Sequence, residues 1–194
     1  MSKTLAKIIS TIFGPLFVCP AVLLVIAVQY THSIYEAYFW VIVLGALLLI
    51  PVASFLLYLI FTKQITDINI SIRENRDNFY VFGLIVTLIT ASIMYAFNAP
   101  TELLLGVFSV FGVNAINALV NELTKISLHT ASLATGATLT FLLLSPTIGI
   151  LGLLLTVVMI YCRILLKYHT FLQAALGALN GIITTYLIFA YLGY

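Results

Sequence analysis

The chain has 194 residues, of which 63% are hydrophobic and 7% are charged, and its formal net charge is +2. Soluble domains carry about 25% charged residues, so this composition excludes a water-soluble fold. The sequence therefore predicts a polytopic membrane protein. Its two cysteines, Cys19 and Cys162, offer neither a disulfide framework nor the spacing of metal ligands.

Charge-free apolar runs predict the membrane-spanning segments. In lipid only helices or closed barrels satisfy the backbone, and the sequence lacks the period-two alternation of a barrel, so we expect an all-α helical bundle. The runs lie near residues 10–30, 38–62, 79–97, 101–121, 130–145, 147–166 and 170–192. They give seven transmembrane helices, and six with one re-entrant middle run is the alternative. We expect residues 1–194 to form a single integral membrane domain.

With seven spans, all basic side chains fall on one side of the membrane. They are Lys3, Lys7, Lys63, Arg73, Arg76, Lys125, Arg163 and Lys167. The other side carries Glu36 and Glu102. The positive-inside rule makes the basic side cytoplasmic. We therefore expect an integral protein of a plasma or inner membrane, with its N-terminus in the cytoplasm.

The first polar segment on the basic side covers residues 67–79. If this segment is helical, Asn69, Arg73 and Arg76 lie at i, i+4 and i+7 and share one face. Alternating isoleucines in the same segment also fit an extended stretch. Both conformations stay open at this point.

Two further segments bring histidines to the same side. His129 lies at the start of the 130–145 run, where free N–H groups and the helix dipole favour an anion. Arg163 and His169 would point about 240° apart on one continuous helix, so we expect a break, with Arg163 ending one span and His169 starting the next. Gln173 is four residues beyond His169, where it can accept a hydrogen bond from the imidazole.

Asparagines mark the interior of two other runs. Asn114, Asn117 and Asn121 fall near one face of the 101–121 run, and Asn180 lies in the last run. Such residues either join helices by hydrogen bonds or line a substrate cavity. The sequence leaves both possibilities open.

The cations and histidines together suit phosphoryl transfer without a metal. One histidine attacks phosphorus, and a second protonates the leaving oxygen. Arginines hold the non-bridging oxygens and stabilise the charge that develops on them. The basic side shows no carboxylates with metal-ligand spacing in the sequence, so we expect neither a metal nor a cofactor.

These residues resemble motifs of the type 2 phosphatidic acid phosphatase (PAP2) superfamily. Arg163-x5-His169, followed by Gln173, is similar to its third motif, S-R-x5-H-x3-D. Gly177 and Gly181 stand four and eight residues after Gln173, where the family often has glycines. The two glycines also form a small-xxx-small pattern that favours a close helix contact.

The other two motifs are present in the same order as in the family. The Ile-Ser-Leu-His stretch at 126–129 is similar to the second motif, P-S-G-H. Asn69-x6-Arg76-Asp77 is similar to the first motif, K-x6-R-P. The resemblance covers roughly residues 63–185 and implies a PAP2-like helical core.

The resemblance also implies roles for individual residues. His169 is similar to the nucleophile that becomes phosphohistidine, and His129 is similar to the general acid. Arg163 and Arg76 are similar to phosphate clamps, and Ser127 to a hydrogen-bond donor to phosphate.

The sequence departs from the family motifs at Asn69 (for Lys), at Ile126 and Leu128 (for Pro and Gly), at Cys162 (for Ser) and at Gln173 (for Asp). Lys125 and Arg73 have no counterpart, and we expect them to bind phosphate in place of the first-motif lysine. Gln173 stands where the family has an aspartate. A glutamine can orient the catalytic histidine but cannot stabilise its imidazolium form.

The expected function is that of a membrane lipid phosphatase. It would hydrolyse a polyprenyl, isoprenoid or phosphatidate-like phosphate or diphosphate through a phosphohistidine, at a site facing the cytoplasm. The alternative, kept open by Gln173, is a non-catalytic lipid-phosphate binding or carrier protein. A small transporter fits less well, because broken helices at mid-membrane are expected there. The expected partners are a lipid phosphate and membrane lipids, and no nucleic acid.

Overall fold

The computed structural model describes residues 1–65, 70 and 72–193. This part of the chain is all-α, as predicted. The helices are α1 (Lys3–Ile12), α2 (Pro15–Gln29), α3 (Ile34–Leu44), α4 (Ile50–Phe61), α5 (Asp77–Ala96), α6 (Thr101–Leu123), α7 (Leu128–Leu143), α8 (Pro146–Leu165) and α9 (Phe171–Leu192). A π-helical turn, Gly45–Leu49, joins α3 to α4, and a short 3-10 turn, Glu74–Arg76, precedes α5.

Helix length and hydropathy identify an integral membrane protein. Within the described residues, five helical segments are long and apolar enough to span a membrane: Ile34–Phe61, Glu74–Ala96, Thr101–Leu123, Pro146–Leu165 and Phe171–Leu192. α1 and α2 give a sixth candidate if they form one span, with a bend of 40° between them. The predicted 130–145 run forms α7, whose 16 residues are fewer than the ~20 that a full span needs.

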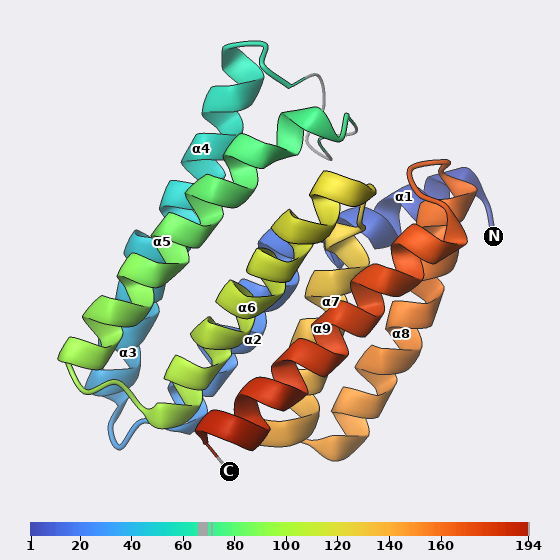
Figure 1. Cartoon of the computed structure of the whole chain (residues 1–194). Coiled ribbons are helices and arrows are strands. Elements are labelled where there is room, and N and C mark those ends of the chain that lie inside the picture. Colours follow the sequence, from blue (N-terminus) through green and yellow to red (C-terminus); the bar gives the residue numbers. More distant parts are fainter. Residues whose placement is uncertain (66–69, 71, 194) are drawn as a thin grey trace.

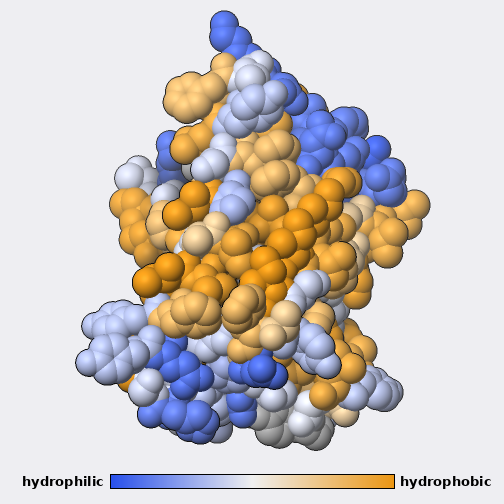
Figure 2. Space-filling view, turned by 90° about the vertical axis from the view of Figure 1, so that its left-hand side faces the viewer, coloured by the Kyte–Doolittle hydropathy of each residue, from blue (hydrophilic) through white to orange (hydrophobic). Residues whose placement is uncertain are grey.

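The surface of the molecule matches this assignment. Figure 2 shows a face whose middle is covered by hydrophobic residues, with hydrophilic residues gathered towards both ends. Figure 1 shows α1 and the connections after α4, α6 and α8 at one end of the bundle, which we call the basic end. The connections after α5 and α7 lie at the other end, with the C-terminus.

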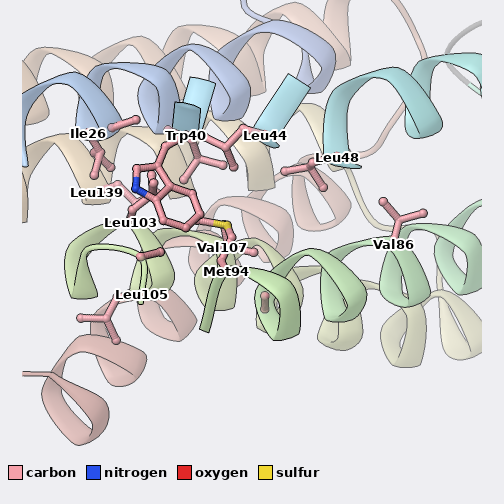
Figure 3. Packing of buried hydrophobic residues seen from close by; sticks show 14 of the residues in the cluster. Ile26, Trp40, Leu44, Leu48, Val86, Met94, Leu103, Leu105, Val107 and Leu139 are labelled. Atoms are coloured by element: carbon pink, nitrogen blue, oxygen red, sulfur yellow. The ribbon is translucent and has the colours of Figure 1, made fainter. Parts of the chain in front are cut away.

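A hydrophobic cluster joins the N-terminal helices to the rest of the bundle. Trp40 of α3 is 2% exposed and stands next to Met94 of α5 and Leu103 of α6 (Figure 3). Ile26 of α2 and Leu139 of α7 belong to the same cluster. Because lipid is as apolar as these side chains, such a cluster stabilises the bundle mainly through close packing.

Small residues let α9 approach α7 closely, as the glycine spacing predicted. A Cβ atom added to Gly177 would lie 2.5 Å from both the carbonyl oxygen of Ser127 and the hydroxyl of Thr130. A Cβ on Gly181 would clash with the carbonyl oxygen of Ala131. This contact fixes the start of α7 against α9, at the basic end.

In the described part of the 67–79 segment, residue 70 and residues 72–79, the chain is not one continuous helix. Ile70 has a φ of 45°, in the left-handed region, and within residues 72–79 the helical conformation begins at Glu74. The Nε atom of Arg76 donates to the carbonyl of Ile70 at 2.8 Å, which holds the chain folded back ahead of α5. Asn69, the expected first-motif residue, lies outside the described residues.

Candidate functional site

A cavity of about 240 Å³ runs from the basic end into the middle of the bundle. Its wall at the basic end is polar, whereas its deeper wall is mostly apolar. The polar side chains at the basic end include Lys7, Ser10, Arg76, His129 and Arg163. The apolar side chains of the deeper wall include Leu23, Leu48, Val52 and Val110. The cavity therefore combines a cationic end with a hydrocarbon-like interior.

Arg76 is held at the cavity by backbone carbonyl groups. Its side chain is 1% exposed, and its Nη1 atom donates to the carbonyl of Ile126 at 2.6 Å. With the bond from its Nε atom to Ile70, this contact ties the segment before α5 to the segment before α7. Burial of a guanidinium within a membrane protein is costly, which makes Arg76 a candidate functional residue.

Arg163 enters the same cavity from α8. It is 1% exposed, its Nη1 atom donates to the hydroxyl of Ser10 at 2.8 Å, and its guanidinium lies 4.4 Å from the ring centroid of Tyr168. The hydroxyl contact joins α8 to α1, and the aromatic face favours a cation. Both contacts fix the guanidinium in one position.

The predicted break between Arg163 and His169 is confirmed. α8 ends at Leu165, and the chain turns at Lys167, where φ is 59°. The backbone N–H groups of Tyr168 and His169 both donate hydrogen bonds to the carbonyl of Arg163, at 3.0 and 3.4 Å. This turn places the imidazole of His169 beside the end of α8.

His169 lies in a strongly positive environment. It is 7% exposed, and its Nδ1 atom has no hydrogen-bond partner among the described residues. Burial is the largest cause that lowers the pKa of His169, to about 3, and the charges of Arg76, Arg163 and Lys125 add to it. A side-chain hydrogen bond with Gln173 acts in the opposite direction. The imidazole is therefore neutral at physiological pH in the protein without a bound anion.

His129 faces the same region from the first turn of α7. It lines the cavity, and a Cβ atom on Gly14 would lie 3.5 Å from its Nε2 atom. The charges of Arg76, Arg163 and His169 all act on it. Arg76, Arg163 and His129, which come from distant parts of the sequence, thus line one cavity. His169 does not line it, but lies close enough for its charge to act on His129.

The other predicted phosphate ligands lie around this group or away from it. Lys125 donates from Nζ to the carbonyl of Tyr168 at 2.9 Å and lies close enough to act on His169. Ser127 is fully buried and accepts from the N–H of Thr130 at 3.4 Å, so its side chain caps α7. Arg73 does not line the cavity, because it donates to Glu74 at 3.3 Å and to the carbonyl of Glu122 at 2.8 Å.

Gln173 has a structural role that the sequence analysis did not predict. Its Oε1 atom accepts from the backbone N–H of Thr170 at 3.2 Å, and the Thr170 hydroxyl accepts from the N–H of Gln173 at 3.3 Å. These reciprocal bonds form a capping box at the start of α9. The pattern T-x-x-Q at 170–173 is a signature of this motif, which the sequence interpretation missed.

Some of the asparagines join helices by hydrogen bonds, and some line the cavity. Asn121 donates to Asp77 at 3.0 Å and joins α6 to α5, and Asn180 of α9 donates to the Oδ1 atom of Asn117 at 2.9 Å. Asn117 and Asn114 also line the cavity.

Among the cavity residues that the sequence did not predict are two from the first helix. Ser10 and Lys7 belong to α1, and no sequence signal places α1 against α8. Spacing along one helix relates residues of that helix only, so contacts between distant helices leave no such periodicity.

The arrangement suits an amphipathic anion. The cations and neutral imidazoles at the basic end can hold an anionic group, and the apolar wall can hold a hydrocarbon chain. Within the described residues, no group of three or more His, Cys, Asp or Glu side chains could hold a metal ion. Comparison of the chain with models of known families, with curated proteins and with solved structures gave no match.

Proposed function

We propose that this protein is a membrane-embedded lipid phosphatase that hydrolyses a lipid phosphate or diphosphate through a phosphohistidine on His169. The observation that carries the proposal is the polarity of one cavity. Arg76, Arg163 and His129 line its basic end, and leucine and valine side chains line its deeper part. A lipid phosphate has the same division between an anionic head and an apolar tail.

The proposal includes a PAP2-like core and a cytoplasmic site. In this arrangement α7 crosses the membrane as a shorter, seventh span, surrounded by α2, α6, α8 and α9. The basic end then faces the cytoplasm, in agreement with the positive-inside rule. A cytoplasmic site would act on lipids of the inner leaflet.

The chemistry proceeds in two displacements. Because burial and neighbouring cations keep His169 neutral, a ring nitrogen has a lone pair available for attack on phosphorus. The N–P bond forms while the P–O bond to the lipid breaks, and protonated His129 gives its proton to the departing oxygen. Water then attacks the phosphohistidine and gives a proton to His129, which releases inorganic phosphate and restores His169.

The cations supply the electrostatic part of catalysis. Arg76 and Arg163 would bind the non-bridging oxygens, and a bound phosphate dianion would stabilise the protonated form of His129. Loss of one such donor in other enzymes costs roughly 10²–10³ in rate. We expect a similar loss for substitution of either arginine.

Phosphate release from purified protein tests the proposal. The substrates are a panel of prenyl and glycerolipid phosphates, in the absence of added metal. His169→Asn should abolish release, whereas His32→Asn, an exposed histidine at the opposite end, should not change it. Release that persists in His169→Asn at the wild-type rate would exclude His169 as the nucleophile.

A second candidate function is non-catalytic binding of a lipid phosphate. The observation that favours it is the capping box, which uses Gln173 structurally at the position where the resemblance calls for an acid. Such a protein would hold the same lipid through the same cations. Tight binding of a lipid phosphate without release from any member of the panel would select this candidate.

A further inference from the structure

The deeper part of the cavity contains the side-chain amide of one asparagine. Asn114 of α6 lines the cavity. Neighbouring asparagines on α6 are engaged, since Asn121 donates to Asp77 and Asn117 accepts from Asn180. The side chain of Asn114 forms no hydrogen bond with any of the described residues.

The position of Asn114 is well below the cationic end. A Cβ atom on Gly83 of α5 would lie 2.8 Å from its Nδ2 atom, so the amide is level with Gly83. Gly83 follows Arg76 by seven residues, which is about 10 Å along a helix axis at ~1.5 Å per residue. The amide therefore lies about two helical turns deeper than Arg76, next to apolar wall residues such as Val110.

An unpartnered amide at this depth is costly unless a ligand satisfies it. Polar side chains within membrane-spanning helices are costly to leave unpaired, and they either bond a neighbouring helix or face a cavity. An amide can donate to a carbonyl oxygen and accept from a hydroxyl or an amide N–H. A polyprenyl chain offers neither group, whereas the backbone of a glycerolipid or a sphingoid lipid offers them a few bonds away from its phosphate.

We propose that Asn114 forms a second polar subsite, which selects lipid phosphates with an ester, amide or hydroxyl group in their backbone over purely hydrocarbon prenyl phosphates. This inference rests on the proposed function, because it takes the cationic end of the cavity as the phosphate site. It narrows the substrate class, which the cations alone leave open.

The test compares a diacylglycerol phosphate with a polyprenyl phosphate, by both binding and phosphate release. Wild-type protein should prefer the diacyl lipid. Asn114→Leu should lower turnover and affinity for the diacyl lipid about tenfold, since one hydrogen bond is lost, and should not lower those for the prenyl lipid. Ser109→Ala is the matched control, because Ser109 is a buried polar residue of α6 that bonds the carbonyl of Leu105, outside the cavity.

A second test changes the lipid instead of the protein, so it does not depend on how well Asn114→Leu folds. A dialkyl ether analogue lacks the ester carbonyl groups, and wild-type protein should bind it several-fold less tightly than the diacyl lipid. If wild type and Asn114→Leu both release phosphate and prefer the diacyl lipid over the prenyl lipid to the same degree, the subsite proposal is wrong. The phosphatase proposal would not be affected by this result. Selective diacyl binding that Asn114→Leu abolishes, without release from any lipid, would overturn the phosphatase and support the subsite.

Discussion

Substitution of Gln173 separates its structural role from its catalytic one. In the structure its Oε1 atom accepts one hydrogen bond, 3.2 Å from the backbone nitrogen of Thr170. Gln173→Ala removes this acceptor, whereas Gln173→Glu keeps an acceptor of the same length. Gln173→Asp is one methylene shorter and should not reach back to Thr170.

The expected magnitudes follow from these geometries. Loss of one partly exposed neutral hydrogen bond costs about 0.5–1.5 kcal/mol, which corresponds to a fall of a few degrees in melting temperature. Gln173→Ala and Gln173→Asp should therefore melt below the wild type. Gln173→Glu should melt at or above it, because a carboxylate in the first turn also interacts with the helix dipole by about 0.3–1 kcal/mol.

The same variants test the chemistry at His169. The carboxylate introduced by Gln173→Glu would stabilise the imidazolium, so it should raise the pKa of His169 and increase phosphate release at least tenfold. Melting is followed by circular dichroism in detergent, and release is measured on the best lipid of the panel. A melting temperature of Gln173→Ala equal to that of the wild type would refute the capping role. Unchanged or lower release by Gln173→Glu would refute the reasoning about the missing acid.

Three further predictions concern packing, pH and orientation. Gly177→Leu should lower the melting temperature strongly, because its side chain would meet the carbonyl of Ser127; an unchanged value would contradict the close α7–α9 contact. Between pH 6.5 and about 3 the unfolded chain protonates His169 and the folded chain does not, so stability should fall by up to about 1.4 kcal/mol per pH unit as the pH drops. His169→Asn should flatten this slope in unfolding experiments, and an identical slope would show that His169 is not buried as a neutral group. A cysteine introduced by Glu36→Cys should react with an impermeant thiol reagent only from outside the cell, and labelling only from the cytoplasm would reverse the orientation.

The sequence predicted the features that depend on local pattern. Charge-free runs located α2 to α9 to within a few residues, but they did not predict α1 as a separate helix. The six-residue separation of Arg163 and His169 predicted the break between α8 and α9. The spacing of Gly177 and Gly181 predicted a close helix contact. Each of these features depends on the composition of one helix or on the ~3.6-residue turn of a helix, and both can be read from a short stretch of sequence.

The features that the sequence did not predict depend on contacts between distant segments. Arg73 and Arg76 are three residues apart and of the same type, yet of the two only Arg76 lines the cavity, because Arg73 bonds Glu74 and the carbonyl of Glu122 instead. The bond from Arg163 to Ser10 joins residues 153 positions apart. No spacing rule within one helix reports such a contact.

The central claim is tested most directly by isolation of the covalent intermediate. Wild-type protein is mixed with a lipid phosphate labelled in its phosphoryl group, quenched within milliseconds to seconds, and digested for mass spectrometry. A phosphohistidine is labile in acid and stable in alkali, and we predict that the label is found on His169 and is lost in His169→Asn. Continued release of phosphate with no labelled histidine, or with the label on another residue, would contradict the account.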